Sequence, residues 1–147
     1  MTLSPQQREF IYQCCVVEQI PSWFPGLLFT AFPGKGGDAK DGFMKKRMGV
    51  KPGWPDIQYT WNSGKLECGV TELKVTGGRV SPDQNRRISE LDRMGWHTEV
   101  CWNTAESVFK ALCSWGLDPK SKSIKEPDYR TWDEKTKDAF NYYTQGE

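Results

Sequence analysis

A pair of strand-like runs in the middle of the chain, joined by a short turn sequence, sets the strongest limit on the fold. Residues 57–61 and 66–75 have strand character, and Asn-Ser-Gly-Lys at residues 62–65 separates them. Runs of this kind around a short glycine-containing turn predict a β-hairpin. Gly77 and Gly78 then end the second strand. The fold is therefore expected to contain an antiparallel pair of strands.

Two copies of a helix-start pattern flank the hairpin. Ser-Pro-Gln-Gln at residues 4–7 and Ser-Pro-Asp-Gln at residues 81–84 each have Ser at the N-cap, Pro at the first helical position and Gln three residues after the cap. The first pattern predicts a helix to about Gln19, because Pro21 soon follows. The second pattern predicts a helix that ends near Gly95.

Shorter runs complete the alternation of helices and strands. We expect further strands at residues 27–32 and 97–102. We also expect a helix at residues 38–48 that ends at Gly49, and a last helix of the core that starts at Thr104.

The composition changes near residue 118. From there on the chain has seven acidic and six basic residues and few aliphatic ones, so residues 118–147 are predicted to form a peripheral tail on a core of residues 1–117. Residues 131–134, Thr-Trp-Asp-Glu, form a candidate capping box. The helix that follows would pack on the body or on a partner through one apolar face, made of Trp132, Ala139, Phe140 and Tyr143.

The 147 residues, 37% of them hydrophobic and 27% charged, suit one ordinary soluble globular domain. No apolar run approaches the roughly 18 residues that a membrane helix requires, and the N-terminus has no export-signal pattern. We therefore expect a cytoplasmic protein with no membrane partner. The five cysteines form no CxxC pair and His97 is the only histidine, which argues against a zinc site and predicts buried free thiols.

Basic residues gather in one segment although the net charge is only +1. Between residues 35 and 51 there are six basic residues against two acidic ones. The six are Lys35, Lys40, Lys45, Lys46, Arg47 and Lys51. Such a run is typical either of a solvated helix face or of a surface that contacts nucleic-acid phosphates.

Asp56 lies just before the hairpin, sixteen residues ahead of Glu72, and Lys74 follows Glu72 by two residues. If the turn is a three-residue loop centred on Gly64, Asp56 stands directly opposite Glu72, with the side chains about 5 Å apart on one face. A register shift of one residue would place the two carboxylates on opposite faces. Lys74 shares the face of Glu72 in either register, because strand side chains alternate.

Two carboxylates at that distance repel each other unless a cation lies between them. Mg²⁺ is the natural candidate, because it prefers oxygen ligands and usually takes one or two carboxylates from a protein, with water and substrate phosphate completing its shell. The chemistry indicated is phosphodiester hydrolysis, in which Lys74 orients the attacking water or stabilises charge in the transition state. The alternative is a turn aspartate followed by an exposed strand face. Apolar Val70, Leu73 and Val75 nearby favour a partly buried, functional site.

The ordered motifs of the chain are Gly49, Gly-Trp-Pro-Asp at 53–56, Glu-Leu-Lys at 72–74, residues 78–84 and Gly-Trp at 95–96. Over roughly residues 9–115 this combination resembles the virus-type replication-repair nuclease (VRR-NUC) family of the PD-(D/E)XK superfamily. The resemblance implies an α/β domain with a central mixed β-sheet flanked by helices, the restriction-endonuclease-like core. Two positions depart from the family pattern: Thr71 replaces a usually apolar residue, and Pro-Gly-Lys-Gly-Gly at 33–37 replaces Pro-Asn-Gly.

The resemblance implies a role for each residue that matches a family motif. Asp56 and Glu72 would bind Mg²⁺ or, in its place, Mn²⁺, with the backbone carbonyl of Leu73 as a further ligand. Lys74 would be the catalytic lysine. Gln84 would approach the site from the helix after the hairpin, and as the third helical residue it also suits a capping box.

The family also places a carboxylate of the first helix near the metal ion, which Glu9 or Glu18 would provide. The function implied is that of a metal-dependent DNA endonuclease in a bacterial or virus-infected host cell. Stand-alone viral members of the family resemble junction-resolving enzymes and act as homodimers, so branched DNA such as a Holliday junction is the expected substrate. The basic residues expected to contact DNA are Lys35, Lys45, Lys46, Arg47 and Arg86.

Three alternatives stay open at this point. The first is a DNA-binding module that keeps the fold without cutting. The second is a restriction-type nuclease that acts on linear duplexes, and the third is a subunit that is active only with a partner.

Overall fold

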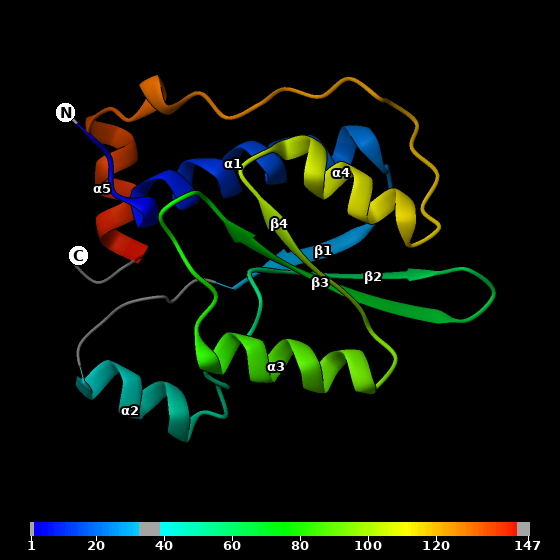
Figure 1. Ribbon diagram of the computed structural model, residues 1–147, viewed down its shortest axis with the longest axis horizontal. Helices are drawn as coiled ribbons and strands as arrows, with labels where there is room; N and C mark the ends of the chain where they lie inside the picture. Colours follow the sequence, from blue (N-terminus) through cyan, green and yellow to red (C-terminus); the bar gives the residue numbers. More distant parts are fainter. Residues whose placement is uncertain (1, 33–38, 144–147) are drawn as a thin grey trace.

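The computed structural model describes residues 2–32 and 39–143. Four strands form a single sheet in the order β1-β2-β3-β4, with β1 at Leu28–Ala31, β2 at Ile57–Asn62, β3 at Leu66–Lys74 and β4 at His97–Trp102. Strands β1 and β3 both run antiparallel to β2, whereas β4 runs parallel to β3, so the sheet is mixed. The expected hairpin is formed by β2 and β3 (Figure 1).

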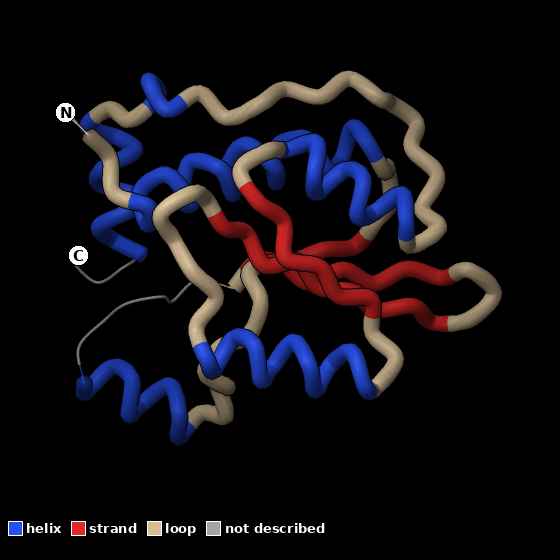
Figure 2. Tube along the Cα trace, in the orientation of Figure 1, coloured by secondary structure: helices blue, strands red, loops and turns tan. Residues whose placement is uncertain are grey.

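Helices lie on both faces of this sheet (Figures 1 and 2). On one face lie α1 (Pro5–Trp23) and α4 (Ala105–Ser114), and on the other lies α3 (Pro82–Arg93), which provides the crossover between the parallel strands β3 and β4. Helix α2 (Ala39–Arg47) lies on the side of α3, and α5 (Glu134–Tyr143) on the side of α1. The predicted central mixed sheet flanked by helices is confirmed.

The main core fills the space between the sheet and the layer of α1 and α4. Helix α1 turns Tyr12, Val16 and Ile20 toward the sheet at a spacing of four residues, each with 0% exposure. They join Leu73 of β3 and Leu112 of α4 in one cluster of buried side chains. Each fully buried aliphatic side chain contributes about 1.5–3 kcal/mol to folding. This cluster therefore anchors β3, the strand that carries the candidate site.

Helix α1 continues past Gln19, where the sequence predicts its end, and it includes Pro21. Proline removes one backbone hydrogen bond from a helix interior and is expected to break the helix. Here burial holds the last turn, because Ile20 and Trp23 have 0% exposure and the Trp23 Nε1–H donates to the Ser123 carbonyl at 2.9 Å. The prediction that Pro21 ends the helix is wrong, since tertiary contacts outweigh the local preference.

The other capping signals appear where the sequence places them. Ser4 Oγ accepts from the Gln7 N–H at 3.1 Å, and Gln7 Oε1 accepts from the Ser4 N–H at 2.9 Å. Thr104 Oγ1 accepts from the Ser107 N–H at 3.1 Å and starts α4. Gly49 follows α2 with a φ of 89°, a conformation that favours glycine. Local side-chain chemistry thus sets these helix boundaries.

The segment after α4 runs back over α1 and α4 (Figure 1). The Lys120 N–H donates to the Trp23 carbonyl at 2.8 Å, and the Gln19 side chain bonds both the N–H and the carbonyl of Lys125 at 2.7 Å. The Glu126 carboxylate accepts from the first two backbone N–H groups of α4. This tail supplies a cap that α4 needs. The division of the chain at residue 117 stays a prediction.

Helix α5 packs on the body through Phe140, which is 4% exposed. The ring of Phe140 lies 5.5 Å from that of Phe10 and 5.4 Å from that of Trp132, both edge-on. A short 3-10 helix, Tyr129–Thr131, precedes α5. The capping box predicted over residues 131–134 is wrong, because Oδ1 of Asp133 instead accepts from the N–H three residues later at 2.8 Å.

Within residues 2–32 and 39–143, no helix is long and apolar enough to cross a membrane. All five cysteines are free thiols, as predicted. The prediction that these thiols are buried is wrong for Cys14, which is exposed, whereas Cys101 is buried. Burial raises the pKa of the Cys101 thiol to about 12.

Candidate active site

The hairpin has the register that brings Asp56 and Glu72 together. Its loop has three residues, since Asn62 pairs with Leu66, and Gly64 at the loop centre has a φ of 103°. Ile57 pairs with Thr71, so the next residues outward, Asp56 and Glu72, stand opposite each other. Both are buried, with exposures of 5% and 0%. The expected register of the hairpin is confirmed.

Asp56 is fixed from both sides. Its Oδ2 accepts from the Leu73 N–H at 2.7 Å, and its backbone carbonyl accepts from the Phe32 N–H at 3.0 Å. A hydrogen bond between a backbone amide and a carboxylate is one of the stronger kinds in proteins. The carboxylate of Asp56 is therefore held against the C-terminal end of β3, at the main chain of the residue that follows Glu72.

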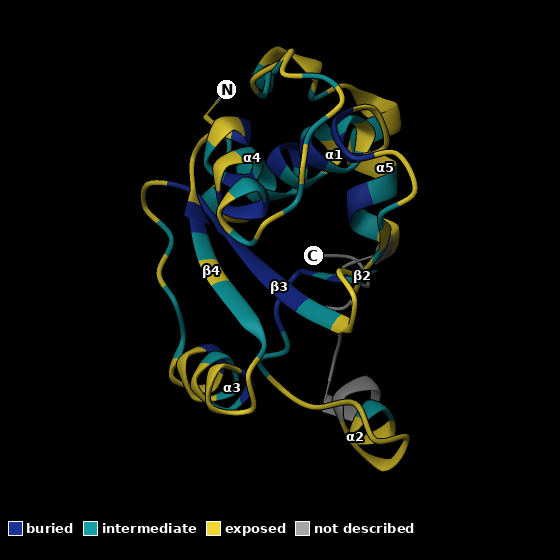
Figure 3. Ribbon diagram, turned by 90° about the vertical axis from the view of Figure 1, so that its right-hand side faces the viewer, coloured by how far each residue is buried: buried dark blue, intermediate teal, exposed yellow. Residues whose placement is uncertain are grey.

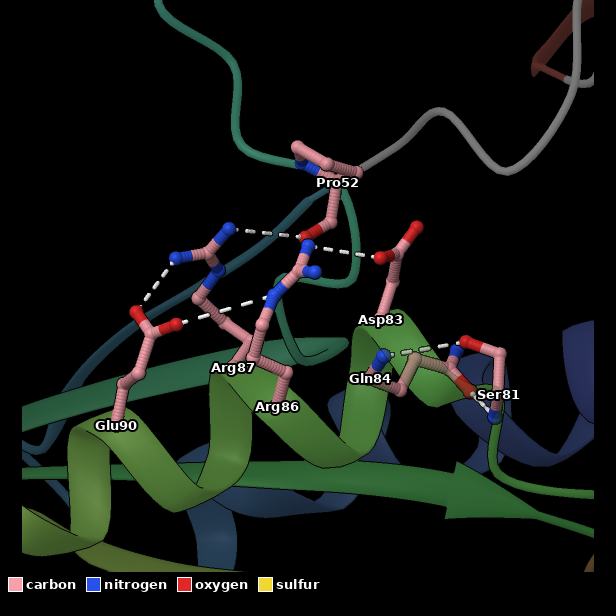
Figure 4. Close-up of polar contacts among 7 residues, drawn as sticks. All are labelled: Pro52, Ser81, Asp83, Gln84, Arg86, Arg87 and Glu90. Carbon is pink, nitrogen blue, oxygen red and sulfur yellow. Dashed lines mark hydrogen bonds and ion pairs between the residues drawn. The ribbon is translucent and has the colours of Figure 1, made fainter.

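Gln84 performs both of the roles that its position suggests. Its Oε1 accepts from the Ser81 N–H at 2.8 Å, while Ser81 Oγ accepts from the Gln84 N–H at 3.1 Å, which completes the capping box of α3 (Figure 4). Its Nε2–H donates to Glu72 Oε1 at 3.2 Å. The cap leaves the amide nitrogen free to face β3, so the two roles do not compete. Gln84 orients the Glu72 carboxylate from the first turn of α3.

Lys74 is the last residue of β3 and is 6% exposed. It lies on the same face as Glu72, since the two are separated by one residue along the strand. Its backbone carbonyl accepts from the Asn103 N–H at 2.8 Å, which fixes the end of the strand. A buried lysine requires compensating charge, and the carboxylate of Glu72 on the same face provides negative charge.

The loop before Asp56 packs directly on the first turn of α3. Gly53 has a φ of 77°, and a Cβ at this position would lie 2.4 Å from the backbone carbon of Asp83 and 2.7 Å from the nitrogen of Gln84. Only glycine fits so close an approach. Arg87 adds a second link, because its Nη2–H donates to the Pro52 carbonyl at 3.4 Å (Figure 4).

These two contacts were missed by reasoning from the sequence. Gly53 belongs to the Gly-Trp-Pro-Asp motif, but the motif does not predict that this glycine contacts α3, because the contact joins segments about thirty residues apart. Arg87 has no sequence signal of its own, because a basic residue on an exposed helix is unremarkable.

Thr71, which departs from the family pattern, has 0% exposure. Its Oγ1 lies 2.9 Å from the hydroxyl of Tyr59 on the neighbouring strand. Burial also raises the pKa of the Tyr59 phenol well above its usual value, so both groups stay neutral. The polar residue is therefore accommodated by one hydrogen bond within the core.

The structure distinguishes between the two glutamates of α1. Glu9 Oε2 accepts from the Val75 N–H at 3.4 Å, directly after the strand end that carries Lys74. It also lies 2.5 Å from where a Cβ on Gly78 would be. Glu18 is exposed and lines a pocket beneath the C-terminal tail. Glu9 is thus brought to the edge of the site, and Glu18 is not.

The donor set fits Mg²⁺ or Mn²⁺ better than zinc. Among the described residues, no three side chains of the His, Cys, Asp and Glu types are grouped as a metal site. What the site offers is oxygen, from the buried carboxylates of Asp56 and Glu72. The Leu73 carbonyl stays a predicted further ligand. Mg²⁺ usually takes one or two protein carboxylates and keeps several waters, and this set is sufficient for it.

The residues expected to contact DNA have different surroundings. Lys46 and Arg47 at the end of α2 are exposed, and Lys45 is half-buried. Arg86 on α3 is 57% exposed, but its guanidinium lies 2.8 Å from Asp83 Oδ1 and 3.9 Å from a Glu90 oxygen (Figure 4). Those carboxylates reduce the positive charge that Arg86 presents to DNA. Lys35 and the loop around it lie outside the described residues.

The family model described as the VRR-NUC domain matches residues 2–105, a stretch that contains the whole candidate site. A solved structure described as a VRR_NUC domain protein is 18% identical and superposes with a TM-score of 0.49, covering 77% of this chain and 88% of that one. No curated protein matches the chain.

Proposed function

Since the chain belongs to the VRR-NUC domain family, whose members are nucleases that process DNA, we propose that it is an endonuclease that hydrolyses phosphodiester bonds in DNA with a divalent metal ion. The observation that carries this proposal is the convergence of Asp56, Glu72 and Lys74, all at most 6% exposed, at one end of the hairpin. Burying three charged side chains is unfavourable unless they pair with each other or bind a metal ion, and such clusters are common at functional sites.

Each residue of the site has a task in this reaction. Asp56 and Glu72 would hold Mg²⁺, or Mn²⁺ in its place, together with the Leu73 carbonyl. When bound, the ion polarises the phosphate and lowers the pKa of an attacking water. Lys74 places positive charge where negative charge develops on the phosphate oxygens. Gln84 holds the Glu72 carboxylate in one orientation through the 3.2 Å hydrogen bond.

The substrate proposed is branched DNA such as a Holliday junction, cut by a homodimer. The support is the resemblance to stand-alone viral members of the family. A homodimer also suits such a substrate, because two sites related by a two-fold axis match a substrate with two equivalent strands. A restriction-type duplex nuclease is the second candidate. A non-cutting module is disfavoured by the intact set of acidic and basic side chains, which binding alone does not require.

The test is cleavage of labelled four-way junction, flap and linear duplex DNA in Mg²⁺, Mn²⁺ or EDTA. The variants are Asp56→Asn, which keeps an acceptor for the Leu73 N–H, and Lys74→Met, with Glu99→Gln as a control at an exposed carboxylate of β4. We expect metal-dependent cutting that falls at least about 100-fold in both site variants and is unchanged in the control.

The substrate ranking then decides between the candidates. Preference for the junction supports the branched-DNA proposal, whereas equal cutting of linear duplexes supports a restriction-type duplex nuclease. Metal-dependent cutting that survives both substitutions would show that the site lies elsewhere. Sedimentation at several protein concentrations tests the homodimer.

A further inference from the structure

Helix α2 and the residues after it carry exposed apolar side chains that the fold does not use. Phe43 is 59% exposed, Met44 50%, Met48 78% and Val50 51%. We refer to these four residues as the α2 apolar face. Figures 1 and 3 show α2 below the sheet, on the side away from α1 and α4, and it makes no extensive contact with another described helix or strand.

An isolated nine-residue helix is marginal in water. Helices of this length are normally held by packing an apolar face, and the apolar side chains described at the end of α2 are half or more exposed. Contiguous exposed apolar side chains mark interaction sites in soluble proteins. The α2 apolar face therefore indicates a binding partner.

Basic residues are interspersed with these apolar residues along the chain. Lys46, Arg47 and Lys51 are exposed, and none of the ion pairs found among the described residues involves them. The Arg47 guanidinium carbon lies 5.9 Å from the centre of the Phe43 ring, as in a cation–π contact. The surface thus combines an aromatic ring, methionines and basic side chains that no acidic residue of the described part of the chain neutralises.

The charge decides which occupant fits. A second copy of the chain packed face to face on α2 would bring two sets of basic residues together, and like charges across an interface are unfavourable. DNA has the complementary charge, and its bases offer flat apolar faces wherever they are not stacked on a neighbour. Phe and Met are among the side chains that proteins insert between unstacked bases, beside Lys and Arg on the phosphates.

The α2 apolar face and the candidate site are close to each other along the chain. Met48 and Asp56 are eight residues apart, a stretch that spans at most about 29 Å. That corresponds to roughly eight base pairs at about 3.4 Å each. The candidate site and the end of α2 are therefore no farther apart than a length of duplex that a single DNA arm can span.

We propose that α2 recognises the branch point of the DNA substrate: Phe43, supported by Met44 and Met48, stacks on a base left unstacked at the junction, while Lys46 and Arg47 bind the adjacent phosphates. This inference rests on the proposed function and adds to it the element that selects branched over linear DNA.

The experiment measures binding without cutting, by fluorescence anisotropy of a labelled four-way junction and of a linear duplex of the same length in EDTA. The variants are Phe43→Ala, which keeps a good helix former in α2, and Lys46→Ala. The matched controls are Leu66→Ala, an apolar residue at the hairpin tip that is 73% exposed, and Lys137→Ala on α5.

For Phe43→Ala we expect the junction affinity to fall at least about fivefold, the lower end of what loss of one stacked aromatic produces, and the duplex affinity to fall less than about twofold. Lys46→Ala should weaken binding to both substrates. It should also reduce the slope of the logarithm of the binding constant against the logarithm of the salt concentration by about one. Both controls should match the wild type. A 2-aminopurine base at the branch should be quenched by the wild type and not by Phe43→Ala.

Three results would overturn the inference. They are an unchanged ratio of junction to duplex affinity in Phe43→Ala, no binding of either DNA by the wild type, and a dimer that dissociates in Phe43→Ala, which would assign α2 to a second copy of the chain. Failure of the proposed hydrolysis is separable, because the affinity ratio is measured without catalysis. If the protein binds junctions through Phe43 but never cuts them, the inference about α2 stands and the proposed nuclease activity is refuted.

Discussion

Replacing Gly53 by alanine tests whether the loop before Asp56 must touch the first turn of α3. The added Cβ would lie 2.4 Å and 2.5 Å from the backbone carbon and oxygen of Asp83, and neither is a flexible side-chain end. A non-glycine residue at a φ of 77° costs about 1–2 kcal/mol. Forced overpacking adds about 1–3 kcal/mol. The sum, about 2–5 kcal/mol, corresponds to a Tm lower by roughly 4–20 °C in a chain of this size.

The matched control is Gly26→Ala. Gly26 has a φ of 86°, but a Cβ there would meet nothing within 4 Å. It carries the backbone strain alone, about 1–2 kcal/mol, so the difference between the two variants isolates the contact. Urea unfolding followed by tryptophan fluorescence measures both. If Gly53→Ala is no less stable than Gly26→Ala, the contact between the loop and α3 does not hold the site in place.

Three further predictions concern the site, the tail and the core. Gln84→Glu keeps the oxygen that caps α3 but puts a second carboxylate where the N–H donated to Glu72, so we expect reduced DNA cleavage together with lower urea stability, because the two buried carboxylates repel each other. Gln84→Ala removes the cap and the N–H without that repulsion, and should lose about 1 kcal/mol of stability. Phe140→Ala should destabilise the chain by about 3–5 kcal/mol and expose the tail to proteases in a limited-digestion assay, because the ring is 4% exposed between Phe10 and Trp132. The pKa of the buried Cys101 thiol in the folded protein, about 12, lies above its ordinary value of 9.0, so its contribution to stability is full below pH 9 and is lost toward pH 12. The stability of the wild type relative to Cys101→Ala should therefore decline over that range, and parallel pH curves would contradict this.

Much of the site could be anticipated because its geometry follows from a local rule. A three-residue loop centred on Gly64 fixes the register of the hairpin, and the register fixes Asp56 opposite Glu72. The caps of α1 and α3 are equally local, since a Ser and a Gln three residues apart complete each other's hydrogen bonds.

What the sequence does not reveal depends on residues far apart in the chain. Pro21 stays helical because Trp23 is buried beneath a segment one hundred residues away, as the bond to Ser123 shows. The choice of Glu9 over Glu18 depends on which turn of α1 faces the end of β3. At the start of α5, two residues compete for the cap, and local preference alone does not separate Thr131 from Asp133.

The double role of Gln84 ties the integrity of the site to a folding event. One side chain both closes the first turn of α3 and aligns Glu72, so fraying of that turn releases the carboxylate at the same moment. Helix ends open far more often than whole domains unfold. Hydrogen exchange at the Gln84 amide, whose N–H is held by Ser81 Oγ, should therefore report the fraction of molecules in which the site is assembled. The first turn of α3 and the site are thus expected to open and close together.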